Sequence, residues 1–352
     1  MQKKCAILIP ALDPPEQLKT YIAELIRAGF SAILLVDDGS TDKSIFAELS
    51  GKPEITVLSH DRNYGKGRAL RTGFRYYKEH FPLEEYIGVI TADSDGQHLT
   101  EDVVQIQKKL LSGTDKMILG CRDFQEANVP PKSRFGNTLT SRCFKVLLGL
   151  SVSDTQTGLR GIPNSLMDLC LSVQGDRFEY ETAVLMKTGK TAGFEEVPIH
   201  TVYFDKNQGT HFHPIRDSFL IYRLLLGTFF IYLLSSLSST LIDFLLFTLC
   251  DKLLLRQLAW RIPASTIAAR LVSGTFNYLV NRNVVFQSRA GYAVSAASYF
   301  LLCAAGAVVS SILVTALTAV LPVDEILIKM FVDTALFFVN YLVQKTFIFK
   351  NK

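Results

Sequence analysis

The sequence predicts a two-part protein, in which an α/β domain with a mostly parallel sheet is followed by an α-helical membrane domain. Two observations carry this prediction. In the first part of the chain, short apolar runs alternate with stretches of helical spacing, and charges are interspersed throughout. From Leu224 to Cys250, by contrast, Asp243 is the only ionisable carboxylate or cation, and that stretch is long enough to span the hydrocarbon core of a bilayer. The length of 352 residues also suits two domains, because single cores stop growing at about 250–300 residues.

The polar half has the element order of an α/β fold. The predicted strands are residues 5–9, 32–36, 55–59, 86–91 and 117–120. The predicted helices between them are residues 14–28, 40–49, 66–77 and 101–111. Strands that alternate with helices in this way form a mostly parallel sheet with helices on both faces.

Composition excludes some classes of partner and compartment. The net charge of +4 is too small to indicate nucleic acid, and there is no dense basic run. The six cysteines are scattered without a CxxC pair, which is typical of small buried residues in a reducing compartment. The first apolar run, residues 5–9, is shorter than the roughly 7–15 residues of a signal peptide. We therefore expect no signal peptide and a cytoplasmic polar half.

Acidic residues follow two of the predicted strands. Asp37 and Asp38 come directly after the second strand, and Asp93 and Asp95 come after the fourth, with Gln97 close behind. Ligands of such sheets bind beyond the carboxyl ends of the strands. Clustered carboxylates repel one another unless a cation offsets them, and the oxygens of Asp93, Asp95 and Gln97 suit Mg²⁺ or Mn²⁺. A solvated turn is the alternative, but the position after buried-looking strands favours a metal site.

Basic segments near these loops indicate a phosphorylated substrate. Residues 63–68 place two glycines and Lys66 at a helix start, where backbone N–H groups favour an anion. The segment lacks the spacing of an ATPase phosphate loop, and an ordinary glycine-rich turn is its alternative interpretation. Arg122, Arg134 and Arg142 follow the second acidic loop, and the arginine fork matches phosphate oxygens.

Seven segments occur in the order found in family 2 glycosyltransferases. They are VDDGS (36–40), NYGKGRAL (63–70), DSDGQH (93–98), GCR (120–122), DTQTGLR (154–160), RFEYE (177–181) and THFHPIRDS (210–218). The polar half therefore resembles this family over about residues 5–222, and within it the dolichyl-phosphate and polyprenyl-phosphate sugar transferases. The resemblance implies a Rossmann-like GT-A domain and a sugar-transfer enzyme.

The resemblance, with the anion argument for Lys66, implies four overlapping sets of site residues. The set expected to bind the nucleotide sugar is Pro10, Asp37, Asp38, Lys66, Asp93 and His211. The metal ligands are expected to be Asp93, Asp95 and Gln97. The acceptor phosphate is expected at Arg122, Arg134 and Thr138. The catalytic set is Asp93, Asp95, Asp154 and Arg160, of which the last two belong to a loop that closes over the reacting groups.

Two local features bear on these roles. The family's first loop is usually P-x-Y-N, whereas this chain has Pro10 to Asp13 as PALD, so no tyrosine is available and the base of the nucleotide is left open. His200, His211 and His213 suggest a zinc site, but no cysteine or carboxylate has suitable spacing, so we favour a polar turn.

The apolar half predicts four spans and an internal repeat. The spans are residues 226–250, 262–285, 292–321 and 326–349. Residues 277–286 and 340–349 share the pattern NYLVx[RK]xhhF, where h is apolar, and these copies end the second and fourth spans. The pattern indicates a parallel repeat of two plus two spans with basic cytoplasmic ends. Together with LIDFLLF (241–247), it resembles the GtrA-like family.

The resulting domain prediction has three parts. Residues 1–213 form a cytoplasmic GT-A domain, residues 214–225 a juxtamembrane amphipathic helix, and residues 226–352 a GtrA-like membrane domain. Charges inside the spans are expensive in hydrocarbon, so we expect Asp243 to pair with Arg270. The protein is then a multi-pass protein of the cell membrane, and its partners include membrane lipids.

The leading functional hypothesis is metal-dependent, inverting transfer of a hexose from a UDP- or GDP-linked donor to a polyprenyl phosphate, such as undecaprenyl phosphate. The transfer would serve cell-envelope polysaccharide glycosylation. In the alternative hypothesis, the GtrA-like half translocates the sugar-lipid. A processive polysaccharide synthase is disfavoured, because the only tryptophan, Trp260, lies outside a QxxRW element. A homo-oligomer and a monomer are both left open.

Overall fold

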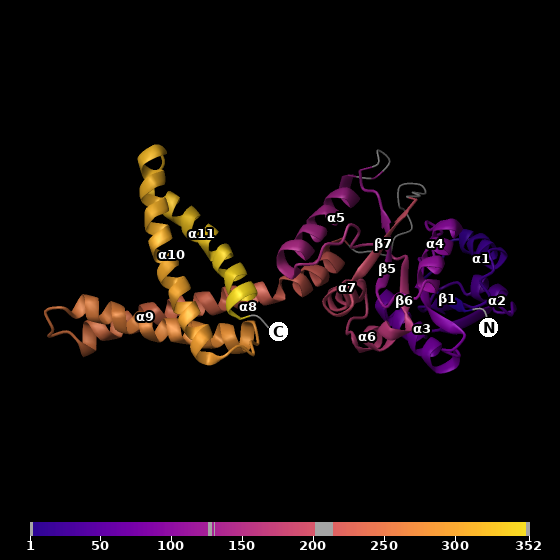
Figure 1. The fold of residues 1–352 in the computed structure, drawn as a ribbon, viewed down its shortest axis with the longest axis horizontal. Coiled ribbons are helices and arrows are strands. Elements are labelled where there is room, and N and C mark those ends of the chain that lie inside the picture. Colours follow the sequence, from indigo (N-terminus) through magenta and orange to yellow (C-terminus); the bar gives the residue numbers. More distant parts are fainter. Residues whose placement is uncertain (1–2, 126–128, 130, 201–213, 350–352) are drawn as a thin grey trace. The chain divides into compact units, whose positions relative to one another are not determined.

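The computed structural model describes residues 3–125, 129, 131–200 and 214–349. The chain divides into two compact units, Met1–Leu225 and Leu226–Lys352, each of which has its own architecture. The first unit is an α/β domain and the second is helical (Figure 1). The predicted order of an α/β part before a helical part is confirmed.

A seven-stranded sheet forms the centre of the first unit. Its strands are β1 (Lys4–Ala11), β2 (Ile33–Asp37), β3 (Ile55–Ser59), β4 (Tyr86–Thr91), β5 (Met117–Arg122), β6 (Arg160–Pro163) and β7 (Phe194–Ile199). Their spatial order is β3-β2-β1-β4-β6-β5-β7. Only β6 runs antiparallel to its neighbours, so the predicted mostly parallel sheet is confirmed. The prediction included β1 to β5 but not β6 or β7.

Helices cover both faces of this sheet (Figure 1). They are α1 (Gln17–Arg27), α2 (Ser44–Leu49), α3 (Lys66–His80), α4 (Thr100–Leu111), α5 (Pro131–Cys143), α6 (Met167–Ser172) and α7 (Glu179–Thr191). Alternate residues of a strand point to opposite faces, and β1 shows this directly. Ile7 and Ile9 share one buried cluster with α1 and α4 residues. Leu8 instead contacts α3 at Gly73, where an added Cβ would lie only 2.2 Å from its Cδ1.

The direction of β6 positions a functional loop. Because β6 is antiparallel, its first residue, Arg160, pairs with Thr91, the last residue of β4. The segment that leads into β6, residues 154–160, ends on the first residue of that strand and is thereby brought to the carboxyl end of β4, where the acidic segment with Asp93 begins. We call residues 154–160 the linking loop.

The second unit consists of four long helices. They are α8 (Pro214–Leu249), which begins in the first unit, α9 (Arg261–Val280), α10 (Tyr292–Val320) and α11 (Glu325–Val343). Figure 1 shows α10 packed beside α11. Among the described residues, three helical regions are long and apolar enough to cross a membrane: Arg216–Leu254, Tyr292–Val320 and Glu325–Ile348. The predicted second span is a helix, α9, but it does not reach this threshold. Its 20 residues are long enough for a span, but Arg261, Arg270 and several hydroxyl side chains lower its mean hydropathy.

The internal repeat is also a structural repeat. Both copies end in a five-residue π-helical segment, Asn281–Val285 after α9 and Gln344–Ile348 after α11. Residues at equivalent positions meet: Asn281 donates a buried hydrogen bond to Gln344 at 3.0 Å, and the rings of Phe286 and Phe349 stack at 5.4 Å. Single π turns inside helices often mark functional positions.

The charged residues within the predicted spans have partners. The expected ion pair forms between Arg270 and Asp243, at 3.7 Å, and Ser273 donates a hydrogen bond to Asp243 at 2.9 Å. Lys329 pairs with Asp333 at 2.9 Å. Pairing lowers the cost of placing charged groups in a low-dielectric environment.

Candidate active site

A cavity of about 260 Å³ opens at the carboxyl ends of β1, β2 and β4. We call it the strand-end cavity. Five of the predicted site residues line it: Pro10, Asp38, Lys66, Asp93 and Asp95. The sheet topology explains why, since parallel strands end at the same edge and the residues that follow them converge there.

Asp37 and Asp38 have different surroundings, although they are adjacent in sequence. Asp38 lines the cavity and accepts hydrogen bonds from the backbone N–H groups of Tyr64 and Gly65, at 3.0 and 2.7 Å. Asp37 is fully buried and accepts the backbone N–H of Ser40 at 2.7 Å. It is not among the residues that line the described cavity, so its local role is to hold the turn that presents Asp38.

An alternating chain of charges runs through the site. The ammonium group of Lys66 lies 2.7 Å from Asp93 and 2.9 Å from Glu181. Glu181 in turn lies 3.7 Å from the buried guanidinium of Arg160, whose Nη1 donates to the Glu181 carbonyl at 3.0 Å. Lys66 therefore links the acidic loop that carries Asp93 to α7, which carries Glu181. Arg160 contacts the same Glu181.

This chain of charges fixes the protonation of its central pair. Burial is the largest effect on Lys66 and lowers its pKa, but the charges of Asp93 and Glu181 together raise the pKa above its ordinary value. Burial likewise raises the pKa of Asp93, but Lys66 and His98 outweigh it and hold the pKa well below its usual range. The Asp93 carboxylate and the Lys66 ammonium are both charged at neutral pH.

The linking loop lies against Asp93. Thr91 donates a hydrogen bond to the Gly158 carbonyl at 2.8 Å. A Cβ on Gly158 would lie 2.2 Å from Asp93 Oδ2, so only glycine leaves room for the carboxylate. The structure thus brings two of the predicted segments, the acidic loop and the linking loop, into direct contact.

The predicted metal ligands are only partly brought together. Asp93 and Asp95 both line the strand-end cavity, whereas Gln97 is absent from its described lining and donates its backbone N–H to Asp95 at 3.0 Å. Burial, followed by the charge of Asp93, raises the pKa of Asp95. No group of three or more His, Cys, Asp or Glu side chains placed for a metal occurs in the described part of the chain.

Two carboxylates still fit one class of metal site. Mg²⁺ is usually held by one or two carboxylates plus substrate phosphates and water, rather than by a complete protein cage. The charge of Asp93 contributes, after burial, to the raised pKa of Asp95, and a divalent cation would offset the repulsion between the two carboxylates. The residues present therefore fit a cation that is shared with a phosphorylated ligand.

The predicted acceptor residues line a second cavity, of about 750 Å³, on the same unit. We call it the basic cavity, because its walls include Arg122, Arg134, Arg142 and Lys145. Thr138 also lines it. The structure brings the predicted acceptor set together.

Asp154 lines neither of these two cavities, but it supports a wall residue of the second. Its carboxylate is fully buried and receives two hydrogen bonds from Arg122, from Nε at 2.7 Å and from Nη2 at 3.1 Å. Asn137 of α5 accepts the backbone N–H of Thr155 at 3.0 Å and donates to the Ser153 carbonyl at 2.7 Å. The start of the linking loop is thus fastened to the walls of the basic cavity.

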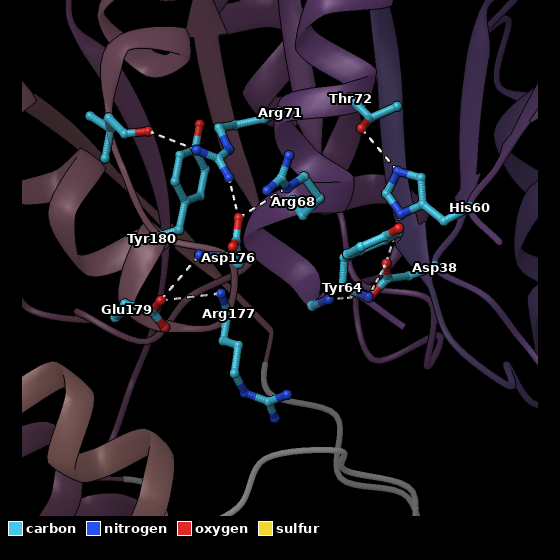
Figure 2. Close-up of polar contacts among 12 residues, drawn as sticks. Asp38, His60, Tyr64, Arg68, Arg71, Thr72, Asp176, Arg177, Glu179 and Tyr180 are labelled. Atoms are coloured by element: carbon cyan, nitrogen blue, oxygen red, sulfur yellow. Dashed lines mark hydrogen bonds and ion pairs between the residues drawn. The ribbon is translucent and has the colours of Figure 1, made fainter. Parts of the chain in front are cut away.

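Arg177 is a cavity residue that motif spacing did not identify. It lines the strand-end cavity and donates a hydrogen bond from Nε to Asp217 at 2.9 Å. Asp217 is fully buried in the first turn of α8. Figure 2 shows Glu179 accepting the backbone N–H groups of Asp176 and Arg177, which fixes the turn that carries Arg177.

Glu181 was also not predicted as a site residue from the sequence, although it is the last residue of the RFEYE segment (177–181). That segment stands out as charged and aromatic residues at a helix start, but spacing alone does not show that Glu181 meets Lys66. The predicted residue His211 lies outside the described residues.

Comparisons with known proteins give the family of each unit. Residues 6–165 match the model of glycosyl transferase family 2, and residues 231–349 match the GtrA/DPMS transmembrane domain. A UDP-N-acetylglucosamine–dolichyl-phosphate N-acetylglucosaminyltransferase of Methanococcus voltae is 28% identical over 243 residues, covering 62% of this chain and 94% of its own length. An undecaprenyl-phosphate 4-deoxy-4-formamido-L-arabinose transferase of Edwardsiella ictaluri is 28% identical over 176 residues, covering 47% of this chain and 51% of its own.

Among solved structures, the glucosyl-3-phosphoglycerate synthase of Mycobacterium tuberculosis, in complex with Mn²⁺, UDP and glucosyl-3-phosphoglycerate, is 16% identical with a TM-score of 0.47. The match covers 64% of this chain and 79% of that one. The resemblance inferred from the motifs is confirmed by the two family models. The chain belongs to glycosyl transferase family 2 and is a glycosyltransferase that carries a C-terminal GtrA/DPMS transmembrane domain.

Proposed function

We propose that this enzyme transfers a hexose from a UDP- or GDP-linked donor to the phosphate of a polyprenyl phosphate, such as undecaprenyl phosphate, with inversion at the anomeric carbon. The relatives from Methanococcus voltae and Edwardsiella ictaluri, which are named for transfer to dolichyl or undecaprenyl phosphate, support the acceptor class. The reaction would take place at the cytoplasmic face of the membrane and contribute to glycosylation of an envelope polysaccharide.

One observation carries the proposal: the linking loop contacts one wall residue of each cavity. Its first residue, Asp154, holds Arg122 in the wall of the basic cavity, and Gly158 lies against Asp93 in the strand-end cavity. A transferase for two phosphorylated substrates needs two anion sites that meet at the reacting atoms. A loop only a few residues long that touches both sites provides that meeting point.

The strand-end cavity is assigned to the donor. Lys66 begins α3, where the helix N-terminus favours an anion, and Arg177 adds a second cation to the wall. A divalent cation held by Asp93 and Asp95 would supply Lewis acidity to the leaving nucleoside diphosphate. In this assignment Asp38 and Pro10 contact the nucleoside, and Asp37 stabilises the turn that carries Asp38.

The basic cavity is assigned to the acceptor phosphate. A phosphate monoester is already anionic at neutral pH, with a second pKa of about 6, so it attacks the anomeric carbon without strong general-base help. Arg122, Arg134 and Thr138 would neutralise and orient this nucleophile. Because the phosphate displaces the nucleoside diphosphate in a single step, the configuration of the sugar is inverted.

A transfer assay tests this proposal. The full chain, purified in lipid nanodiscs with Mg²⁺ or Mn²⁺, is offered undecaprenyl phosphate and a panel of labelled UDP- and GDP-sugars. We expect a labelled lipid from at least one donor, with inverted anomeric configuration, and its loss in Asp95→Asn. Absence of a lipid product with every donor would overturn the proposal.

The helical unit has a second candidate role, in moving the sugar-lipid across the bilayer. In this proposal the polar half, residues 1–213, is the cytoplasmic catalytic domain, residues 214–225 are juxtamembrane, and residues 226–352 include the four spans. The observation that favours it is the repeat, whose buried Asn281 and Gln344 pair within apolar helices. If truncation after residue 228, with an unrelated membrane anchor, left outward delivery of the sugar-lipid unchanged, this role would be excluded.

A further inference from the structure

A third cavity, of about 390 Å³, lies along α3 and belongs to neither of the assigned sites. We call it the α3 cavity. Three arginines of one helix face, Arg68, Arg71 and Arg75, line it together with His60, Tyr64, Thr72, Leu171 and Gln174. Its described lining contains no carboxylate. The volume falls within the range of about 300–1,000 Å³ that is usual for small-molecule sites.

The charge of this cavity is only partly balanced. Asp176 pairs with both Arg68 and Arg71, as Figure 2 shows, but its side chain is not part of the lining. Arg71 also donates to the Val173 carbonyl at 3.4 Å. Arg75 is exposed and makes no hydrogen bond or ion pair with any residue that the structure describes. One carboxylate therefore faces three guanidinium groups, each of which carries five N–H donors.

Further polar side chains and an aromatic ring complete the cavity. His60 Nε2 and Thr72 Oγ1 lie 2.9 Å apart, and both residues line it (Figure 2). The Tyr64 ring has the guanidinium of Arg68 over it at 5.8 Å. Arginine forks beside a hydroxyl group are the arrangement that recognises phosphate oxygens.

The α3 cavity shares a wall with the donor site. Asn63 and Gly65 line the strand-end cavity, whereas Tyr64, between them, lines the α3 cavity. Asp38 holds this turn through the N–H groups of Tyr64 and Gly65, and it also hydrogen-bonds to His60 at 2.7 Å. A ligand in the α3 cavity would therefore touch the back of the turn that forms the donor site.

The turn formed by residues 63–65 is closely packed, so it has little room to move when a ligand contacts it. A Cβ on Gly65 would lie 2.4 Å from the Asp176 carbonyl oxygen, and a Cβ on Gly39 would lie 2.2 Å from the Arg62 backbone. Such close packing transmits displacement rather than absorbing it.

We propose that the α3 cavity binds a second phosphate-bearing ligand, separate from donor and acceptor, through Arg68, Arg71 and Arg75. The phosphate could belong to a soluble metabolite or to the headgroup of an anionic lipid, since both present the same oxygens. This proposal depends on the α3 cavity, and it does not depend on which sugar the enzyme transfers.

Hydrogen–deuterium exchange of the full chain, resolved by peptide, tests the proposal. Inorganic phosphate is added to the protein in detergent, with ionic strength held constant by chloride. We expect slower exchange in residues 60–75 of the wild type and loss of this protection in the double variant Arg68→Gln/Arg75→Gln. Lys108→Gln/Lys116→Gln, which removes two positive charges from exposed positions outside the cavity, should keep the protection. Any protection of residues 131–145, at the basic cavity, should be equal in all three proteins.

Nanodiscs distinguish the two sources of phosphate. Protection of residues 60–75 that appears when phosphatidylglycerol is added to phosphatidylcholine discs would identify a lipid headgroup, and protection by soluble phosphate alone would identify a metabolite. Two outcomes overturn the proposal: no protection of residues 60–75 under either condition, or protection that persists undiminished in the double variant.

Discussion

Arg122 and Asp154 form a bidentate ion pair, in which Arg122 Nε lies 2.7 Å and Nη2 lies 3.1 Å from the two carboxylate oxygens of Asp154. Arg122 is the last residue of β5, and Asp154 begins the linking loop. The pair fastens the loop to the edge of the sheet. Four residues further on, Gly158 of the same loop meets Asp93. One side-chain pair thus fastens a loop that contacts a wall residue of each cavity.

The substitution Asp154→Asn should weaken use of the acceptor. Arg122 would lose a charged hydrogen-bond partner, and such bonds contribute about 1.5–3 kcal/mol, so we expect the KM for polyprenyl phosphate to rise about tenfold or more. The KM for the donor should change little. Steady-state kinetics with each substrate varied in turn gives both values. Asp115→Asn, at an exposed position, is the control, and equal increases in both KM values would contradict the assignment.

The substitution Gly158→Ala should impair the donor side. The added methyl group would meet Asp93 Oδ2 at 2.2 Å and displace the carboxylate. We expect kcat to fall about 100-fold, while the free energy of unfolding falls by only about 1–3 kcal/mol, as for other overpacked sites. Gly51→Ala is the matched control, because no atom lies within 4 Å of its added Cβ. A fully active Gly158→Ala enzyme would show that contact with Asp93 is dispensable.

Much of this arrangement follows from the sequence, and the exceptions have physical causes. The strand ends β1, β2 and β4 were predictable because apolar runs are followed at once by Pro10, Asp38 and Asp93. Strand β6 was not, because Arg160–Pro163 is only four residues long and contains glycine and proline.

Contacts between residues that are far apart in the sequence were also not predictable from it. The pairing of Lys66 with Glu181 joins residues more than a hundred positions apart, and no local pattern specifies it. Asp154 was expected in a loop that closes over the reacting groups, and the sequence did not show that its carboxylate pairs with Arg122. The second predicted span forms the helix α9, whose apolar residues are interrupted by Arg270, so it is not among the three regions of the described residues that are apolar enough to cross a membrane.

Asp217→Asn should loosen Arg177 and weaken donor binding. Asp217 is buried and is the carboxylate that holds the guanidinium in the cavity wall. We expect the donor KM to rise several-fold, with the acceptor KM unchanged. Asp168→Asn, at an exposed carboxylate paired with Lys78, serves as the control. The assignment fails if Asp217→Asn retains the wild-type donor KM.

Metal removal should abolish transfer reversibly. With two carboxylates, Asp93 and Asp95, to hold it, the cation should bind weakly until a nucleoside diphosphate contributes its own oxygens. Calorimetry should show tighter Mn²⁺ binding in the presence of the nucleotide, and this gain should be lost in Asp95→Asn. Full activity in the presence of excess chelator would rule out a metal at this site.

Asn281 and Gln344 should be energetically coupled in the helical unit. A double-mutant cycle with Asn281→Ala and Gln344→Ala, read out as unfolding of the full chain in detergent, should give a coupling of about 0.6 kcal/mol, the average for polar pairs between membrane helices. Strictly additive effects would indicate that the paired side chains contribute no interaction energy.

The central claim is that residues 154–160 join the donor and acceptor sites, and linked binding tests it most directly. The affinity for the nucleoside diphosphate is measured in nanodiscs with and without undecaprenyl phosphate, for the wild type and for Asp154→Asn. Because coupling between sites is reciprocal, a shared loop predicts that the acceptor changes nucleotide affinity in the wild type, and that the substitution removes this change. Identical nucleotide affinity with and without the acceptor in the wild type would contradict the claim.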